Sequence, residues 1–169
     1  MLILQEINII KYNINMLDIE DFKKKLDKKS RLMGIDPGKK RVGIAISDEN
    51  KIIASPYTTL IKNNYSKFLG DIKTIIKENN IKGIIIGNPI NLNGTPSQSS
   101  QSAKDLAINL SKDITENVTI WDERLSSQGA FNLSRNLNIN TSKKVEKLDQ
   151  NSAQFILQGA LDYLTKENT

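Results

Sequence analysis

Residues 32–47 form the segment that most constrains the fold of this chain. Two alternating apolar runs, 32–36 and 42–47, flank a short basic turn, a pattern that predicts two adjacent antiparallel strands. Asp36 closes the first run on a face that is otherwise apolar. Burying a lone carboxylate costs several kcal/mol unless a cation or hydrogen-bond donors compensate it. We therefore expect a positive partner beside Asp36, either a side chain or a metal ion.

The chain of 169 residues contains neither cysteine nor histidine, which narrows its chemistry. Thiol nucleophiles, Ser-His-Asp triads, disulfides and Cys/His zinc sites are excluded. Any catalysis would come from carboxylates, Lys, Arg, hydroxyls, backbone groups or a bound ion. Carboxylates without imidazoles favour the oxygen-preferring cations Mg²⁺ and Mn²⁺ over zinc.

Two further acids occupy positions that favour a half-buried carboxylate. Glu123 ends an alternating strand pattern that contains Trp121, and Asp149 lies one helical turn before Ala153 on the apolar stripe of the last helix. If these acids converge with Asp36 at one edge of a sheet, they raise one another's pKa. A pair of divalent cations would remove this repulsion and create a phosphoryl-transfer site.

Each acid also has a structural interpretation that involves no metal. Asp36 could begin a tight turn and accept hydrogen bonds from nearby backbone N–H groups. Glu123 and Arg124 could form a surface ion pair of little energetic consequence. Asp149 could be an acid that the macrodipole favours near a helix start. The combination of the three acids, without His or Cys, favours the metal site.

Hydrophobic periodicity predicts a single α/β domain with a mixed sheet. Three adjacent strands with short links, the third over 51–60 with an interruption near Pro56, indicate an antiparallel meander. Two later strands, over 83–87 and 117–123, alternate with helices, so we expect helices on both faces of the sheet. The predicted helices span 65–79, Ser97 to about 114, 125–137 and 149–164, and the predicted loops span 88–96 and 138–147.

Basic residues provide candidate contacts for a polyanion. The net charge is +5 and the pI about 9.3, which fits a nucleic-acid partner but also a general bias toward Lys, Asn and Ile. The turn after Asp36 is the strongest cluster because it adjoins that carboxylate. For the lysines of 138–147, a solvated loop is an equally good interpretation. The candidate contacts are Lys39, Lys40, Arg41, Asn88, Arg124, Lys143, Lys144 and Lys147.

Four motifs of the chain together resemble one known family. They are GIDPGKKRVGIA at 34–45, GNPINLNG at 87–94, DERLS at 122–126 and DQNSAQFIL at 149–157. Their order and approximate spacing are similar to those of the YqgF/RuvX family of proposed pre-16S rRNA nucleases, also described as Holliday-junction-resolvase-like. The resemblance covers about 31–164. Asn88 stands where the family usually has an apolar residue, and Ser126-Ser127 where Thr is common.

The resemblance implies an RNase H-like fold over 31–169. The preceding residues, 1–30, form an N-terminal extension in which Ile19, Phe22 and Leu26 at helical spacing predict a helix. The resemblance also implies a nuclease that processes the 5′ end of pre-16S rRNA in the cytoplasm. At the matching motif positions, Asp36, Glu123 and Asp149 would be the catalytic and metal-binding acids. Two Mg²⁺ or Mn²⁺ ions would be the cofactors.

Other functions stay open at this stage. A Holliday junction resolvase that cuts branched DNA would act as a symmetric dimer, whereas an RNA nuclease could be a monomer or a homodimer. A non-catalytic ribosome-assembly factor could use the same fold as a binding platform. A phosphotransferase of the sugar kinase or actin type would need two such domains, and this chain supplies one.

Membrane targeting is not expected. No apolar run approaches the roughly 20 residues that span a bilayer. The first residues lack the basic segment and small-residue cleavage site of a signal peptide. We therefore expect a cytoplasmic protein with no membrane partner.

Overall fold

A computed structural model describes residues 15–89, 98–126 and 142–166 of the chain, and for 98–99 and 142–148 it describes the backbone alone. The centre of the structure is a five-stranded sheet in the order β3-β2-β1-β4-β5. Its strands are β1 (Arg31–Pro37), β2 (Arg41–Ser47), β3 (Ala54–Ile61), β4 (Ile81–Asn88) and β5 (Asn117–Asp122).

The sheet is mixed, as predicted. β1 pairs with β2 and β2 with β3 in antiparallel register, whereas β4 runs parallel to both β1 and β5. The β2–β3 register shifts beside Pro56, because Ile44 pairs with Thr58 and the next residue, Ala45, pairs with Pro56. The predicted interruption of the third strand is therefore a bulge on an edge strand, a position that tolerates proline.

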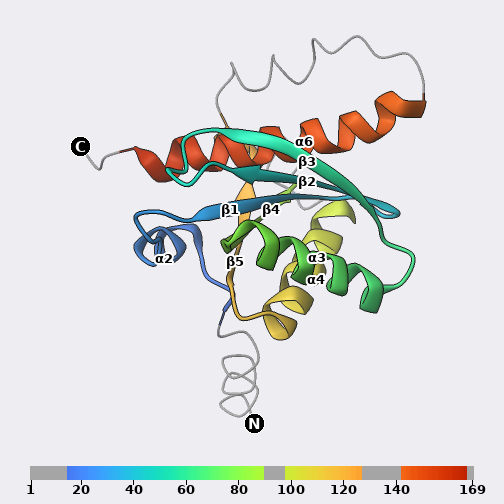
Figure 1. The fold of residues 1–169 in the computed structure, drawn as a ribbon, viewed down its shortest axis with the longest axis horizontal. Helices are drawn as coiled ribbons and strands as arrows, with labels where there is room; N and C mark the ends of the chain where they lie inside the picture. Colours follow the sequence, from blue (N-terminus) through green and yellow to red (C-terminus); the bar gives the residue numbers. More distant parts are fainter. Residues whose placement is uncertain (1–14, 90–97, 127–141, 167–169) are drawn as a thin grey trace.

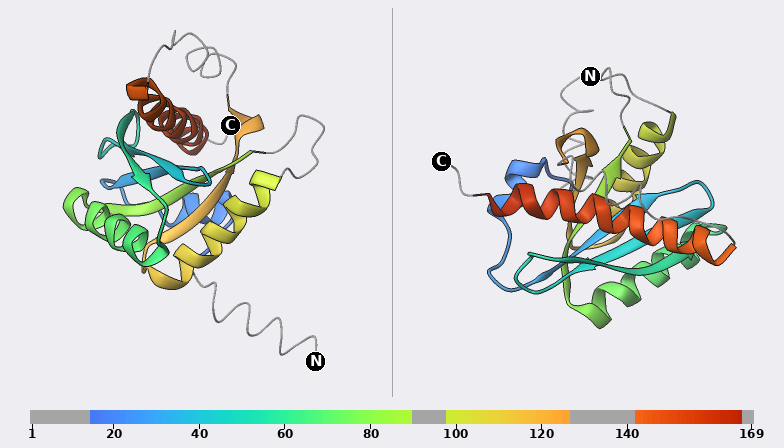
Figure 2. Two further views of the ribbon diagram at one scale, coloured as in Figure 1. Left: turned by 90° about the vertical axis from the view of Figure 1, so that its right-hand side faces the viewer. Right: turned by 90° about the horizontal axis from the view of Figure 1, so that it is seen from above.

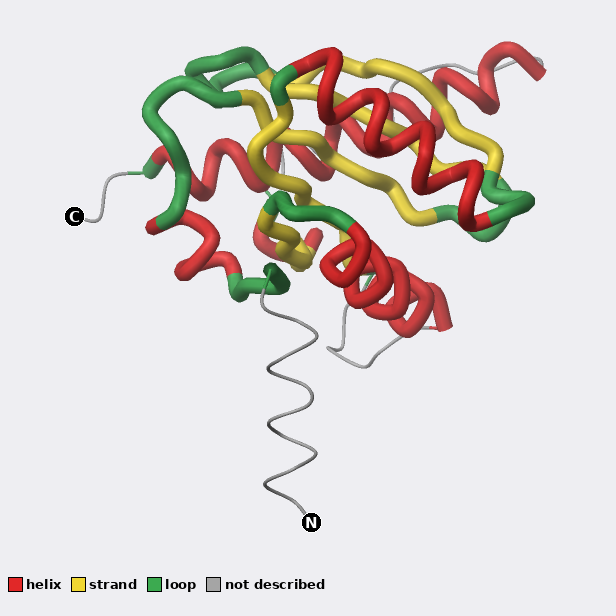
Figure 3. Tube along the Cα trace, turned by 60° about the horizontal axis from the view of Figure 1, so that its bottom comes forward, coloured by secondary structure: helices red, strands yellow, loops and turns green. Residues whose placement is uncertain are grey.

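Helices cover both faces of the sheet, which gives three layers (Figures 1 and 2). On one face lie α3 (Tyr65–Asn79) and α4 (Gln98–Asp113), and on the other lie the short α2 (Ile19–Lys24) and the long α6 (Ser142–Thr165). A single 3-10 turn, η1 (Glu123–Leu125), follows β5 directly. Figure 3 shows the helices on either side of the twisted strands.

Two apolar cores hold the layers together, one on each face of the sheet. The central strands alternate between them, so β4 is buried throughout its apolar run, as predicted for a strand covered on both faces. Burying one such large apolar side chain fully contributes about 1.5–3 kcal/mol relative to exposing it. The core on the α3 and α4 face includes Met33, Ile35, Ile44, Phe68, Ile72, Ile84, Ile86 and Leu106. The core on the α6 face includes Phe22, Leu32, Ala45, Ile85, Trp121, Ile156 and Leu157.

The first described residues add to the free edge of β5. Met16 forms an isolated parallel bridge with Val118, and the Leu17 N–H donates to the Val118 carbonyl over 2.9 Å. The Asn15 side-chain amide donates to the Ile114 carbonyl over 2.9 Å. This contact covers part of a strand edge that would otherwise be open to pairing with another chain.

Two sequence predictions need correction. We expected a loop over 138–147, but α6 begins at Ser142, so the backbone of 142–147 is helical. Lys and Glu in this segment are good helix formers, and their charge favours a solvated helix as readily as a loop. We also expected a helix from residue 125, whereas η1 ends at Leu125 and Ser126 is extended. The remainder of that expected helix, 127–137, and most of the expected loop over 88–96 lie outside the described residues.

Within the described ranges, no helix is both long and apolar enough to cross a membrane.

Candidate active site

Asp36 lies near the end of β1 on the face that α6 covers. Met33 and Ile35 belong to the core under α3 and α4, whereas Leu32 belongs to the core under α6. Because side chains alternate along a strand, Asp36 shares the α6 face with Leu32. The predicted placement of this acid at the end of a buried face is confirmed, and Asp36 is half-buried.

Asp149 reaches the same place from α6, and Gly43 makes its close approach possible. Gly43 is the antiparallel partner of Asp36 in the sheet. A Cβ atom on Gly43 would overlap the backbone carbonyl of Asp149. Only a residue without a side chain lets α6 pass this close to β2. The packing of α6 therefore brings Asp149 beside the strand pair that carries Asp36.

Glu123 approaches the same face from the end of β5, again over a glycine. Gly87, on β4, follows Ile85 on the α6 face, and a Cβ at Gly87 would lie 2.8 Å from Glu123 Oε1. Directly after η1, Ser126 accepts a hydrogen bond of 3.1 Å from the Trp121 indole N–H. Trp121 is fully buried, so the turn that carries Glu123 is anchored to the core.

The negative charges near Asp36 and Glu123 add to the effect of burial on their pKa values. The pKa of Asp36 is raised to about 6, chiefly by burial and then by the negative charge of Asp149. The pKa of Glu123 is raised to about 7, chiefly by burial and then by the charges of Asp36 and Asp122. Both shifts mean that the folded protein penalises the charged forms, which a nearby cation would favour.

The third acid already has a cationic partner. Arg41 Nε donates to Asp149 Oδ2 over 3.0 Å, and Arg41 Nη2 lies 2.8 Å from the same oxygen. Nη2 is buried and, although it is this close, is not in hydrogen-bond geometry with any described acceptor. The positive side chain that we expected beside Asp36 is therefore present, but it contacts Asp149.

The donor set fits a hard divalent cation. All three side chains offer carboxylate oxygens, the ligands that Mg²⁺ and Mn²⁺ prefer. In their present rotamers, no three acidic side chains among the described residues lie close enough together to hold one ion. Asp36, Glu123 and Asp149 therefore share the α6 face near the carboxyl ends of β1 and β5 without forming one compact cluster, and Arg41 binds Asp149.

Arg124 is also paired, with a residue that sequence reasoning did not select. Its Nε lies 3.0 Å from Asp122 Oδ1 and 3.1 Å from Oδ2, and its Nη2 lies 2.7 Å from Oδ2. This contact lowers the pKa of Asp122. Asp122 also caps η1 by accepting from the Arg124 backbone N–H over 3.0 Å. The DER spacing is the sequence signal for this pair, because an acid directly before a tight turn is a frequent cap.

The other predicted nucleic-acid contacts lie at different distances along the chain and on different faces of the sheet. Lys39 and Lys40 are exposed in the turn between β1 and β2, close to Asp36 in the chain. Asn88 is only 6% exposed, and strand alternation after Gly87 places it on the opposite face, that of α3 and α4. Its Oδ1 has no hydrogen-bond partner among the described residues. Lys143, Lys144 and Lys147 lie on the first turns of α6, where the side chains are outside the described part.

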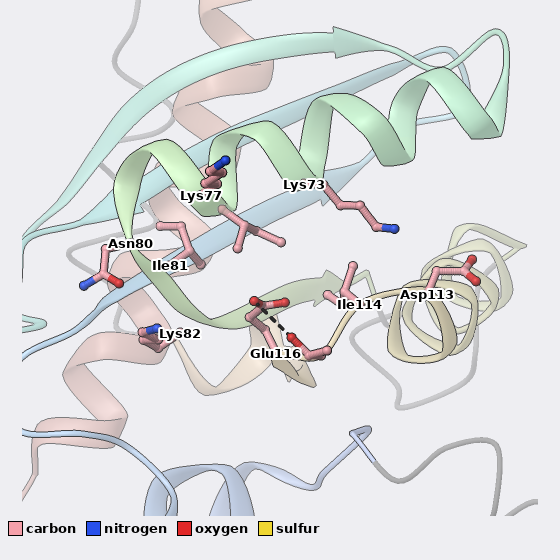
Figure 4. Close-up of a pocket in the computed structure, with 10 residues that line it drawn as sticks. Lys73, Lys77, Asn80, Ile81, Lys82, Asp113, Ile114 and Glu116 are labelled. Atoms are coloured by element: carbon pink, nitrogen blue, oxygen red, sulfur yellow. Dashed lines mark hydrogen bonds between the residues drawn. The ribbon is translucent and has the colours of Figure 1, made fainter.

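A pocket lies at the other end of the strands from the acids, where β4 and β5 begin (Figure 4). It is formed where α3 ends, where β4 begins and where α4 connects to β5. Its charged lining is mixed: Lys73, Lys77 and Lys82 surround a space that Asp113 and Glu116 also border. None of the predicted site residues lines it, so the candidate chemistry lies on the α6 face and not in this hollow.

Sequence reasoning missed the two glycines and Asp122 as parts of the site. Gly43 and Gly87 carry no chemistry of their own, yet they make room for Asp149 and Glu123. A signal for Gly43 was its place two residues after Arg41, within an otherwise apolar strand. A glycine at such a point often marks the close approach of another segment.

Comparisons with known proteins identify the relatives of this chain. A family model described as "RuvX: Holliday junction resolvase" matches residues 30–163. A protein of Pelagibacter ubique named "Putative pre-16S rRNA nuclease" is 52% identical over 149 residues, which cover 88% of this chain and 99% of that protein. A protein of the same name from Rhodobacter capsulatus is 36% identical over 146 residues, 86% of this chain and 92% of its own.

Among solved structures, RuvC of T. thermophilus in complex with a Holliday junction substrate matches with a TM-score of 0.52. The match covers 80% of this chain and 93% of RuvC at 8% identity, so it speaks for the fold alone. It confirms the predicted RNase H-like fold. Because the family match spans 30–163 and the Pelagibacter protein aligns over almost its whole length, this chain belongs to the RuvX family.

Proposed function

We propose that this protein is a divalent-metal-dependent endonuclease that hydrolyses phosphodiester bonds and processes the 5′ end of pre-16S rRNA. The observation that supports the proposal is that Asp36, Glu123 and Asp149 come from three different elements to the α6 face of the sheet, where Asp149 raises the pKa of Asp36 and Asp36 raises that of Glu123. The names of the relatives support the substrate class.

Mg²⁺ or Mn²⁺ fits the acids because burial penalises their charge and a cation would offset that penalty. Asp36, Glu123 and Asp149 would hold the ion or ions. When bound, the metal lowers the pKa of a water molecule and stabilises the oxygen that leaves the phosphodiester. The protein contributes the fixed positions of its acids: Asp36 is set by the sheet, and Glu123 by the anchored turn after β5.

A site with three carboxylates repels a phosphate backbone unless cations accompany it. Lys39 and Lys40 are exposed in the turn that follows Asp36, so they can contact backbone phosphates on the approach to the acids. Such contacts position the substrate without reading its sequence. Arg124 is a weaker candidate because Asp122 already occupies its guanidinium.

Branched DNA is the second candidate substrate. The family description and the fold shared with RuvC support it. The two candidates differ in what the site must contact, since a resolvase cuts two strands symmetrically and acts as a dimer. A labelled four-way junction and a labelled pre-16S 5′ segment, offered in parallel to the same preparation, separate them.

The test of catalysis is cleavage of the labelled pre-16S 5′ segment with Mg²⁺, Mn²⁺ or EDTA. We expect cleavage with either metal and none in EDTA. Asp36→Asn is expected to lose about a hundredfold or more in rate, because the lost charge removes several kcal/mol of transition-state stabilisation. Asp105→Asn is the matched control, since Asp105 is an exposed acid on α4 that bonds Gln101.

Two results would overturn the proposal. Undiminished cleavage by Asp36→Asn would show that the acids do not carry the chemistry. Binding of the RNA by the wild type without cleavage in either metal would favour a non-catalytic assembly factor. RNA binding by Asp36→Asn is expected to stay within about threefold of the wild type, because phosphate contacts supply most of the affinity.

A further inference from the structure

The ion pair between Arg41 and Asp149 joins two elements that are far apart in the chain. The residues are 108 positions apart, and their side chains are 33% and 24% exposed. Strand alternation places Arg41 on the same face of β2 as Gly43, over which the Asp149 backbone lies. The guanidinium therefore lies on the α6 face beside Asp149, one of the three candidate acids.

The pair uses a single carboxylate oxygen. Both Arg41 contacts, 3.0 Å from Nε and 2.8 Å from Nη2, fall on Asp149 Oδ2. The strong arrangement for arginine and carboxylate has two parallel hydrogen bonds to two oxygens. The contact seen here is an incomplete version of it, because Nη2 is buried and makes no hydrogen bond to any residue that the structure describes. A guanidinium with such an unpaired buried N–H group gains free energy when it donates to another acceptor.

A divalent cation and this guanidinium compete for the same oxygen. A metal ligand must lie within about 2.0–2.6 Å of the ion. Asp149 Oδ2 already has two nitrogens of Arg41 within 3.0 Å. A cation bound there would lie a few ångströms from a positive guanidinium, and the repulsion between them is strong in a half-buried site.

We propose that Arg41 is a built-in counter-ion that leaves Asp149 when a divalent cation binds and then contacts a phosphate of the substrate. This inference rests on the proposed function. In the metal-free protein, Arg41 offsets the negative charge of Asp149, the acid whose charge raises the pKa of Asp36. After release, its planar donors match a phosphate oxygen pair, and Lys39 and Lys40 of the adjoining turn are exposed beside the same approach.

The direct test follows the wild-type protein by nuclear magnetic resonance during a Mg²⁺ titration. The Nε–H signal of Arg41, assigned by its loss in Arg41→Lys, is expected to be protected from exchange without metal and to shift and lose protection at saturation. The carboxyl carbon signals of Asp36, Glu123 and Asp149 report metal binding independently. A shift of these carboxyl signals while the Arg41 signal stays unchanged would overturn the counter-ion proposal and leave the metal site intact. No change in the carboxyl signals would instead remove the metal site, and with it both proposals.

Calorimetry with Mn²⁺ gives a second measurement. Arg41→Gln is expected to bind Mn²⁺ about five- to tenfold more tightly than the wild type, because the competing charge is gone. Arg31→Gln is the matched control: Arg31 opens β1 at the far end from Asp36, and its variant should bind Mn²⁺ like the wild type. In saturating Ca²⁺, Arg41→Gln should also bind the labelled RNA about tenfold more weakly. Unchanged or weaker Mn²⁺ binding by Arg41→Gln would contradict the proposal.

Discussion

Two arginine–aspartate pairs lie near the candidate active site, and their contacts differ. Arg124 and Asp122 are two residues apart, and both carboxylate oxygens accept from the guanidinium. Arg41 and Asp149 come from a strand and a distant helix, and only one oxygen is used. The first pair forms within a single turn, whereas the second exists only because α6 packs over Gly43.

The two pairs also differ in their proposed roles: Arg124 and Asp122 stabilise a turn, whereas Arg41 binds a candidate metal ligand. The Arg124 side chain is 40% exposed, so solvent screens its interaction and its loss should matter little. The Arg41 pair is nearly as exposed, at 33% and 24%, and Asp149 raises the pKa of Asp36 much as Asp122 raises that of Glu123. What sets the Arg41 pair apart is that its acid is itself a candidate metal ligand. The same two residue types therefore cap a turn in one place and balance the charge of a candidate metal site in the other.

The largest expected effect is a difference in RNA cleavage rate between variants of Asp149 and Asp122. Asp149→Asn should lose about a hundredfold or more in single-turnover cleavage of the pre-16S segment, because a candidate metal ligand is lost. Asp122→Asn should lose less than about threefold, since its role is a local cap and an exposed pair. Equal losses in the two variants would erase the distinction between the pairs.

The next effect is the pH dependence of stability in EDTA. The folded-state pKa values of Asp36 and Glu123, about 6 and about 7, are raised from 3.8 and 4.5. Between its ordinary and its raised pKa, each of the two acids is more protonated in the folded than in the unfolded state. The contribution of Asp36 and Glu123 to the free energy of unfolding is therefore fully present below pH 4 and is lost as the pH rises toward 7. Each group contributes at most about 3 kcal/mol.

Thermal unfolding in EDTA between pH 5 and pH 8 measures this effect. We expect the melting temperature to fall over this range and the fall to be smaller in Asp36→Asn, which no longer has a charge to bury. Asp105→Asn should follow the wild type, because Asp105 is exposed. A wild-type melting temperature that rises over this range would show that other groups outweigh the buried acids.

A smaller effect is expected on the melting temperature, which should fall more in a variant of Arg41 than in one of Arg124. Arg41→Gln in EDTA at pH 7.5 should lower the melting temperature by about 2–8 °C, because it leaves the acids uncompensated at a cost of about 1–3 kcal/mol. Arg124→Gln should change it by no more than about 1 °C. Addition of Mn²⁺ should restore most of the loss in Arg41→Gln, since a bound ligand stabilises the folded state. Calorimetric scans of both variants, with and without Mn²⁺, provide the measurement.

The smallest expected effect concerns RNA binding. Replacing Lys39 and Lys40 together by Gln should reduce the slope of log affinity against log salt by about 1–2, because two phosphate contacts are lost. Arg124→Gln should leave that slope unchanged, since its guanidinium is already bonded to Asp122. Fluorescence anisotropy over a salt series measures both. An equal decrease in the two variants would mean that Arg124 leaves Asp122 to meet the RNA.

Much of the fold could be predicted from local patterns. The helix over 65–79 matches α3 to the residue, because Asn64 caps it, Asn80 ends it in a left-handed conformation and an apolar stripe lies between them. The first two strands follow from the alternation on either side of the basic turn. The start of α6 could not be predicted in this way, since a polar, Lys-rich segment is compatible with either a loop or a solvated helix.

The candidate site was predictable only in part. The identities of Asp36, Glu123 and Asp149 follow from their places at strand ends and on an apolar stripe, and the motifs they share with one family strengthen that choice. The pairing partners of Arg41 and Arg124 were not predicted, because a basic residue near an acid in sequence can point to solvent, to substrate or to another acid. Asn88 was expected to contact the substrate, and strand alternation places it on the other face.

The sequence by itself determined most of the element types, the absence of thiol and imidazole chemistry, and which acids were available. These properties depend on residue identity and on patterns within a few turns or strand pairs. Only the tertiary structure decided that α6 crosses the sheet over Gly43, that Glu123 lies over Gly87, and that Arg41 holds Asp149. Those contacts join segments separated by as many as 108 residues, and only the packing of α6 on the sheet brings such segments together.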